Sequence, residues 1–323
     1  IVDRKGHIIG VLINPPVPGQ QWAEVVEAAT AAMHATREKM TFPADAYHHR
    51  RATGDGFPAA ARGFAFRGGR QEVGNIKASS QTNAAAMDEL MEDPSIGRMA
   101  TYPIRKQLFG EAGRFAYFAA VSFALLRKNP RLHRTWARSP LAAATFNLGP
   151  VSVSPPHVDG GNKADGMCLI GVLGDFNADH GGHLVCWDYD LIICFPPGCS
   201  ILIPSAVVTH SNTPIQDGEE RFSLIQYSAR GLFRWIANGF CSDLDWQASA
   251  ASEDLARREE ECQTRCATAL KKFTQWKDAK VKNFSGRGRV EVWDEGDVAD
   301  FSDLTEDESG NDDGPPKKKA CRG

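Results

Sequence analysis

The chain has 323 residues, which is enough for one large domain or two ordinary ones. Its composition, 42% hydrophobic and 24% charged, is that of a globular protein, and the absence of an apolar run of 18 or more residues argues against a membrane span. Of its 37 basic and 40 acidic residues, four basic and eleven acidic ones lie in 291–323. Residues 1–290 therefore carry 33 basic and 29 acidic residues, a mildly basic balance that permits a polyanionic partner without requiring one.

The eight cysteines are spread along the chain and none are spaced as C-x-x-C. This spacing is typical of reduced thiols in an intracellular protein. It favours neither a disulfide framework nor a structural zinc site.

The first 142 residues are predicted to form a mainly helical, α+β support region. Residues 8–13 read as a buried strand that ends before a Pro-Pro pair, and 48–71 read as a polar, Arg-rich loop. Helical spacing of apolar residues predicts helices over 21–39, 83–92 and 113–128, with Pro94 and Pro130 as stops, and a shorter one near 133–136. We expect these helices to pack against the outside of a sheet.

From Ala143 the pattern changes to short apolar runs separated by Gly and Pro turns. Such spacing predicts an all-β barrel or jelly roll, and the core is placed at 143–240. The predicted strands are 143–148, 167–173, 183–187, 191–195, 200–203, 207–210 and 221–227.

The C-terminal part has two predicted segments. Residues 241–284 are predicted to be a helical segment, rich in Glu, Lys and Arg with an apolar stripe, that either flanks the barrel or projects from it. Residues 285–323 are predicted to be a disordered acidic tail with a basic end. The run Pro315–Lys319 is similar to a short nuclear-import signal, and a charged tail without an address is the alternative.

The strongest chemical signal is His157-Val158-Asp159. On an extended segment, side chains two residues apart point to the same side, so an imidazole and a carboxylate can bind one metal ion. We expect the third ligand from a distant strand and prefer His210 over His180 and His183, because a long β excursion separates it from Asp159. Two His and one carboxylate form the facial triad of non-haem Fe(II) oxygenases. A polar turn is the alternative interpretation.

Arg221 and Ser223 follow His210 on a predicted strand, with their side chains on one face. A buried Arg there would bind a carboxylate of 2-oxoglutarate in a bidentate manner, and Ser223 would add a hydroxyl. The 2-oxo acid and O₂ would complete the coordination of Fe(II), and the co-substrate would leave as succinate and CO₂. A surface Arg on an edge strand is the alternative.

These residues carry a family resemblance. His157-x-Asp159, His210 and Arg221-x-Ser223, together with the run Pro196–Pro204, resemble the double-stranded β-helix Fe(II)/2-oxoglutarate dioxygenases over about 143–235. The strings Pro156–Asn162 and Gly181–Leu184 are similar to the expansions of such proteins in mushroom-forming fungi. Those are related to the TET/JBP group, which oxidises methyl groups on nucleobases in DNA. The resemblance implies the fold, Fe(II), 2-oxoglutarate and O₂.

Two classes of function remain open. The first is a dioxygenase, either nuclear and acting on a methylated base in DNA or acting on a protein or small molecule. The second is a binding protein that keeps the β-helix without turnover. The basic loop His48–Arg51, with Arg62, Arg67 and Arg70, is either a track for phosphates or solvated surface. The pattern predicts no membrane contact and no particular oligomeric state.

Overall fold

The computed structural model describes residues 1–16, 21–49, 51–66, 69–107 and 112–278. The predicted tail and its basic run lie outside them, as do Arg50 and Arg67. The helices have the following bounds: α1 Trp22–Lys39, α2 Gln81–Glu92, α3 Pro94–Gln107, α4 Ala112–Lys128, α5 Arg230–Ala237, α6 Asp243–Ser249 and α7 Ser252–Leu270. The strands are β1 Val11–Ile13, β2 Ala59–Ala65, β3 Gly74–Asn75, β4 Ala143–Asn147, β5 Cys168–Asp175, β6 Leu184–Cys186, β7 Leu191–Ile193, β8 Ser200–Ile203, β9 His210–Asn212 and β10 Glu220–Tyr227.

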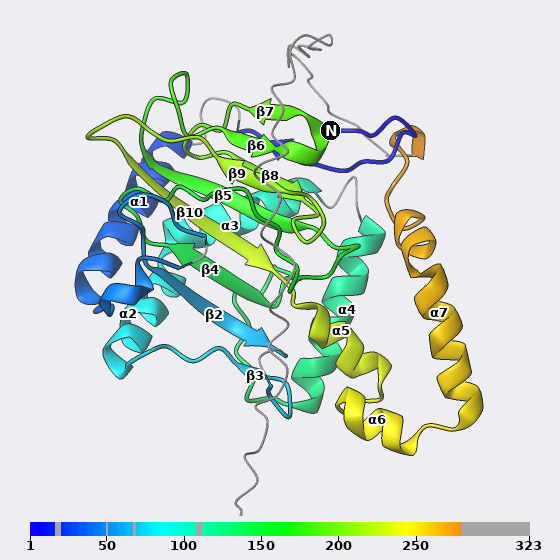
Figure 1. Ribbon diagram of the computed structural model, residues 1–323. Helices are drawn as coiled ribbons and strands as arrows, with labels where there is room; N and C mark the ends of the chain where they lie inside the picture. The colour runs from blue at the N-terminus through cyan, green and yellow to red at the C-terminus, as the bar shows by residue number, and fades with distance from the viewer. Residues whose placement is uncertain (17–20, 50, 67–68, 108–111, 279–323) are drawn as a thin grey trace, which may run out of the picture. The chain divides into compact units, whose positions relative to one another are not determined.

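The strands form two antiparallel sheets (Figure 1). One has seven strands in the order β1-β8-β5-β10-β4-β2-β3, and the other has three in the order β7-β6-β9. Neighbours in the large sheet are far apart in sequence, as in a jelly roll, which confirms the predicted fold class. The division at residue 142 stays a prediction. However, β1, β2 and β3 precede that residue and pair within the same sheet as the core strands.

Alternating side chains of the large sheet enter two different cores, as the twofold period of a strand requires. On β10, Phe222 and Leu224 pack with helical residues on the outer face. On β5 and β8, Val172, Ile201 and Ile203 pack with β6 residues between the two sheets. Ser223 lies opposite Val172 in the ladder, so Arg221 and Ser223 face the space between the sheets.

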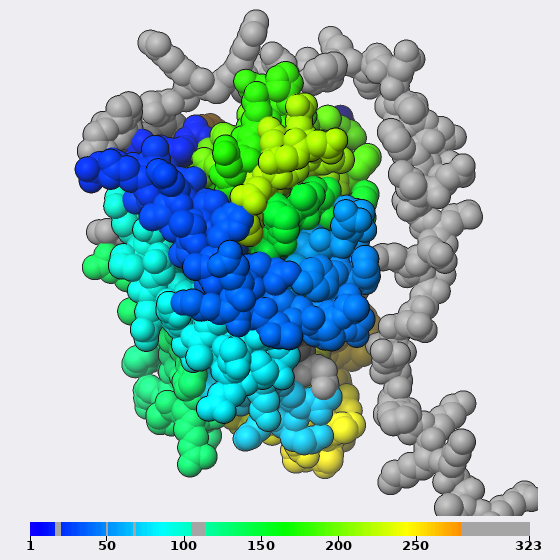
Figure 2. Space-filling model, turned by 90° about the vertical axis from the view of Figure 1, so that its left-hand side faces the viewer, coloured from blue at the N-terminus to red at the C-terminus, as the bar shows by residue number. Residues whose placement is uncertain are grey.

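Helices α1, α2 and α3 cover the outer face of the large sheet, as expected. Their buried residues, including Met33, Leu90 and Met99, form one cluster with Phe146 of β4 and Phe222 of β10. Figure 2 shows α1 and the segment that follows it, in blue, lying against the green to yellow-green part of the chain that contains the later strands. Among the described residues, no helix combines the length and apolarity needed to cross a membrane.

Several local predictions were wrong. The region 48–71 contains β2, which the sequence pattern did not reveal because the charged Arg62 interrupts its small and apolar residues. Pro94 does not only stop α2 but also begins α3, since proline is tolerated at the first helical position. Residues 133–136 are not helical, and 207–209 form a turn that leads into β9 instead of a strand.

The segment after β10 is helical through α5, α6 and α7. Helices α6 and α7 lie within the predicted helical segment 241–284, whereas α5 lies within 143–240, which was predicted as β core. Helix α7 has no buried residue, and it stands away from the sheets in Figure 1. The residues directly after α7 are anchored by two contacts. Phe273 is buried, and Lys272 forms an ion pair with Asp165, which also pairs with Lys163. The predicted apolar stripe is therefore buried only at this end, because Leu255 and Leu270 are exposed.

We expect Asp165→Asn to lower the free energy of unfolding by roughly 2 kcal/mol, the scale of a hydrogen bond to a charged group. Asp165 is buried, and its two lysine partners lower the pKa of its carboxyl against the opposing effect of burial. A lowered carboxyl pKa contributes stability near neutral pH that is lost as the pH falls below about 4. Urea unfolding at pH 7 and at pH 3 measures both effects. If Asp165→Asn lowers the free energy of unfolding as much at pH 3 as at pH 7, the ionised Asp165 carboxylate is not the source of the stability.

Candidate metal centre

His157 and His210 face each other on neighbouring extended segments. The His157 N–H donates to the His210 carbonyl (3.1 Å), and the His210 N–H donates to the His157 carbonyl (2.9 Å). Residues that exchange both backbone bonds are directly opposite, so their side chains leave on one face. The ring centroids lie 4.4 Å apart. One β bridge therefore brings together His157 and His210, which are separated by 52 residues in the sequence.

Both imidazoles are oriented in the same way by local backbone. Nδ1 of His157 donates to the Pro155 carbonyl (2.8 Å), and Nδ1 of His210 donates to the Val208 carbonyl (2.9 Å). These bonds place the proton on Nδ1 and leave the lone pair of each Nε2 available to a metal ion. Burial, and then the neighbouring charge of His210, lower the pKa of His157 to about 4, so its ring is neutral at neutral pH.

Asp159 completes the cluster. Its N–H donates to the Ser205 carbonyl (2.7 Å), and its carbonyl accepts from the Asn162 N–H (2.8 Å), which fixes the turn that follows the ligand segment. One ligand atom from each of His157, Asp159 and His210 lies within 4.8 Å of the others. The structure thus brings together the three predicted residues, and it includes neither His180 nor His183 in this group.

Arg51 reaches the same cluster from a loop between α1 and β2. Its guanidinium nitrogen Nη2 lies 2.6 Å from Oδ1 of Asp159. The sequence predicts Arg51 in a basic loop that is either a track for phosphates or solvated surface, and no spacing signal links it to a residue 108 positions later. Only the folded chain shows that its anionic partner is internal.

Arg221 is buried, with 1% of its surface exposed. Its Nη1 donates to the Ser152 carbonyl (2.7 Å), whereas its Nε is buried without a hydrogen-bond partner. No carboxylate pairs with it among the residues that the structure describes. Burial lowers its pKa to about 10, so the side chain is still a cation at neutral pH. A buried cation without a counter-ion is costly, which is the condition that an anionic ligand relieves.

The backbone of β5 lies very close to that of β10 beside Arg221. Gly174 lies opposite Arg221 in the β5–β10 ladder at φ +124°, and a Cβ there would lie 2.1 Å from the Glu220 carbonyl oxygen. Ser223 is buried on the same face, and its hydroxyl accepts from Asn147 Nδ2 (2.9 Å). Arg221 is therefore an interior residue rather than an exposed arginine on an edge strand.

The segment 151–157 joins the two parts of the site. Ser152 donates both its N–H (3.1 Å) and its hydroxyl (2.9 Å) to the Arg221 carbonyl, while His157 is bonded to His210. Ser152 and His157 are five positions apart in the chain, so their Cα atoms lie at most about 18 Å apart. The cation and the metal cluster are thereby held in one region of the molecule.

Other candidates from the sequence have structural roles. His183 Nε2 donates to the Ala178 carbonyl (2.8 Å). Arg62 pairs with Asp88, and Arg70 donates to the carbonyls of Gly74 and Asn75, so neither guanidinium is free to follow a phosphate backbone. The aromatic residues Phe195, Phe222 and Phe233 belong to the core, and the seven described cysteines are free.

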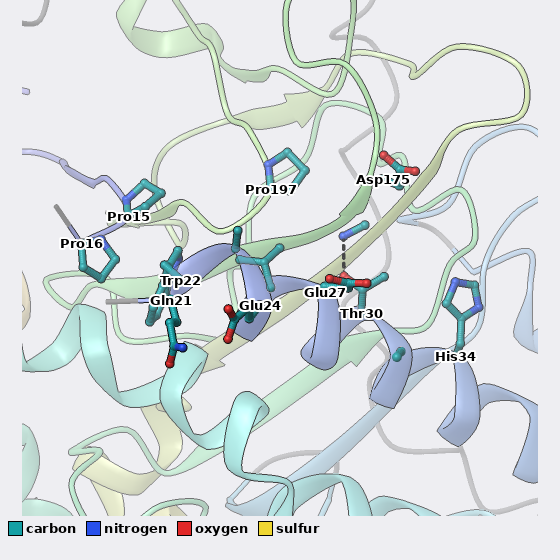
Figure 3. A pocket seen from close by; sticks show the side chains of 14 residues that line it. Pro15, Pro16, Gln21, Trp22, Glu24, Glu27, Thr30, His34, Asp175 and Pro197 are labelled. Carbon is teal, nitrogen blue, oxygen red and sulfur yellow. Dashed lines mark hydrogen bonds between the residues drawn. The ribbon is translucent and has the colours of Figure 1, made fainter. Parts of the chain in front are cut away.

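A surface pocket of about 910 Å³ lies away from these residues (Figure 3). It is bounded by α1 and by loops that carry Pro15 and Pro197, and none of the metal cluster lines it. Figure 3 shows the side chains of Glu24 and Glu27 on α1 and that of Asp175 on β5 around it. This acidic lining does not suit a dicarboxylate or a polyanion.

Comparisons with known proteins give a likeness of fold. No protein-family model matches the sequence, and no curated protein matches it. The solved structure of NgTET1 in complex with 5mC DNA superposes with a TM-score of 0.51 at 14% identity, covering 71% of this chain and 75% of that chain. At this identity the likeness shows the shared fold.

Two further solved structures superpose more loosely. A 2OG-Fe(II) oxygenase family oxidoreductase from Burkholderia pseudomallei has a TM-score of 0.34 at 14% identity, covering 68% of this chain and 84% of that chain. A Pseudomonas putida prolyl-4-hydroxylase has a TM-score of 0.35 at 16% identity, covering 70% of this chain and 94% of that chain. These two superpositions carry no argument about this protein.

Proposed function

We propose that this protein is an Fe(II)- and 2-oxoglutarate-dependent dioxygenase whose metal ligands are His157, Asp159 and His210. The observation that carries the proposal is the convergence of three ligand atoms within 4.8 Å, two from imidazoles and one from a carboxylate. This donor set, on one side of the ion, is that of the facial triad. An Fe(II) ion held by these three residues would retain coordination positions for co-substrate and O₂.

The residues also fit the co-substrate. 2-Oxoglutarate carries two carboxylates. The buried guanidinium of Arg221, which has no carboxylate partner among the described residues, offers charge-assisted hydrogen bonds to the one that does not bind the metal. Ser223 lies on the same face of β10 and supplies a hydroxyl. When bound, iron supplies the oxidative decarboxylation of 2-oxoglutarate to succinate and CO₂ with transfer of one oxygen atom to a C–H bond. The chain supplies the ligand geometry and a buried cation for the acid.

For the substrate, we propose a methyl group on a nucleic-acid base. The support is the fold shared with NgTET1, whose structure is in complex with 5mC DNA, and the predicted resemblance of the sequence 156–162 to TET/JBP-like proteins. A base in a duplex must leave the stack to reach a metal centre inside a jelly roll, so we expect single-stranded or flipped bases to be the reacting form. A nuclear location accords with such a substrate and is part of the proposal.

Release of succinate is the direct test of the reaction class. Purified protein incubated with Fe(II), ascorbate and 2-oxoglutarate is expected to release succinate at a rate that a chelator abolishes and that added Fe(II) restores. Mass spectrometry of nucleosides after incubation with methylated DNA is expected to show an oxidised methyl group. His183→Ala, which removes a histidine outside the cluster, serves as the matched control and is expected to behave like the parent.

The possible outcomes separate the two levels of the proposal. Succinate without any oxidised nucleoside retains the dioxygenase and rejects the nucleic-acid substrate, in favour of a protein or small molecule. No succinate with any of these substrates, from protein that has bound Fe(II), contradicts the enzyme and favours a binding protein with the same fold.

A further inference from the structure

We propose that Arg51 is a positioning residue of the metal centre, which holds the carboxylate of Asp159 so that only one of its oxygens is presented to the metal ion. The inference rests on the proposed function. Its starting point is the ion pair of 2.6 Å between Arg51 Nη2 and Asp159 Oδ1. With Oδ1 engaged, Oδ2 remains as the oxygen that is free to bind metal alongside the two Nε2 atoms.

The loop that carries Arg51 is fixed from within. The Arg51 N–H donates to Nδ1 of His49 (3.3 Å), and Nε2 of His49 donates to the Phe57 carbonyl (3.0 Å). The rings of His49 and Phe57 also pack edge to face. Burial lowers the pKa of His49, in keeping with a neutral ring that accepts at one nitrogen and donates at the other. The backbone of Arg51 therefore has a defined position before any metal binds.

The same loop is also tied to the segment that carries the ligands. The N–H and the hydroxyl of Thr53 both donate to the Val153 carbonyl, at 3.2 and 3.0 Å. Val153 directly follows Ser152, the residue that binds Arg221, and lies four residues before His157. Arg51 is thus fixed with respect to the segment that holds both the metal cluster and the co-substrate cation.

If Arg51 only neutralised the charge of Asp159, the expected effect of its removal on metal affinity would be different. A guanidinium close to the site repels a divalent cation, so a simple counter-charge to Asp159 would compete with metal, and its removal would tighten metal binding. An orienting partner has the opposite effect. Loss of a residue that orients a metal ligand costs about 10–100-fold in metal affinity.

The test is titration of the metal-free full chain with Co(II), measured by calorimetry and by the visible spectrum of the bound ion. Arg51→Met is expected to weaken Co(II) binding by about 10–100-fold and to change the spectrum, because the carboxylate can then rotate. Arg51→Lys keeps a hydrogen-bond donor and the positive charge, so its affinity for Co(II) is expected to lie between those of the parent and of Arg51→Met. Arg234→Met is the matched control. It breaks another Arg–Asp pair whose arginine is partly exposed, to Asp243 at 2.7 Å, outside the group of predicted metal ligands, and is expected to leave binding and spectrum unchanged.

Thermal unfolding of the metal-free variants checks that the loop change leaves the fold intact. If Arg51→Met does not fold, Arg51→Gln removes the same ion pair with a polar side chain suited to a site that is 38% exposed. Binding by the folded variant that equals or exceeds that of the parent, with an unchanged spectrum, overturns the positioning role. A parent chain that binds no Co(II) or Fe(II) instead overturns the proposed function, so the two failures are distinguishable.

Discussion

His157→Ala is expected to abolish Fe(II) binding and, with it, the release of succinate. The variant removes one of three ligand atoms and breaks the paired arrangement with His210. The expected loss of affinity exceeds the roughly 10–100-fold that removal of an outer partner costs, because a direct bond to the metal is lost. Calorimetric titration with Fe(II) under anaerobic conditions measures it, and succinate assays at saturating Fe(II) measure the consequence.

His183→Ala is the control for the histidine substitution. His183 is also a histidine whose ring nitrogen donates to a backbone carbonyl, yet it lies outside the cluster. We expect it to retain the iron affinity of the parent. Because the backbone bonds between residues 157 and 210 do not involve the side chain, His157→Ala is expected to keep the fold, which circular dichroism verifies. A folded His157→Ala protein with the iron affinity of the parent would remove this residue from the ligand set.

Arg221→Met is expected to raise the KM for 2-oxoglutarate by about 100-fold. Hydrogen bonds to a charged group contribute roughly 1.5–3 kcal/mol, and each 1.4 kcal/mol corresponds to about tenfold in affinity. The same variant is expected to unfold at an equal or higher denaturant concentration than the parent when both are free of ligand. Arg221 is buried without a carboxylate partner among the described residues, and replacing a buried charge by an apolar side chain of similar length removes that cost.

This combination, weaker binding without loss of stability, distinguishes a ligand-binding cation from a structural one. Ser223→Ala is the companion variant and is expected to raise KM by only a few fold, because its hydroxyl is already engaged by Asn147. Steady-state assays with varied 2-oxoglutarate and urea unfolding provide the two measurements. An unchanged KM for Arg221→Met contradicts its role, and a large loss of stability would assign it to the fold instead.

Much of the local structure was predictable because it depends on short-range patterns. The apolar spacing of 21–39 predicts α1 to within one residue at its start, and β8 has the predicted bounds 200–203. Strand β2 was missed because it lies within an Arg-rich stretch. Its pairing with β4 comes from a distant partner and not from its own composition. Helix α3 was missed because Pro94 was interpreted only as a stop.

The residue types of the candidate site follow from the chain alone. His157 and Asp159 share a face because extended backbone alternates, and the same rule places Arg221 and Ser223 together. The prediction that His210 lies near His157 and Asp159 depended on an expected sheet. One β bridge places His210 directly opposite His157. Their function as metal ligands stays a proposal.

Tertiary structure alone decided the environment of these residues. Which nitrogen of each histidine is free depends on the carbonyls of Pro155 and Val208. Arg221 is flanked by Gly174 of β5 and by Val151, both distant from it in the sequence. The pairing of Arg51 with Asp159 joins residues 108 positions apart through a loop anchored at Val153. No periodicity encodes such a contact, since it arises only when the sheet brings separate segments within hydrogen-bonding distance.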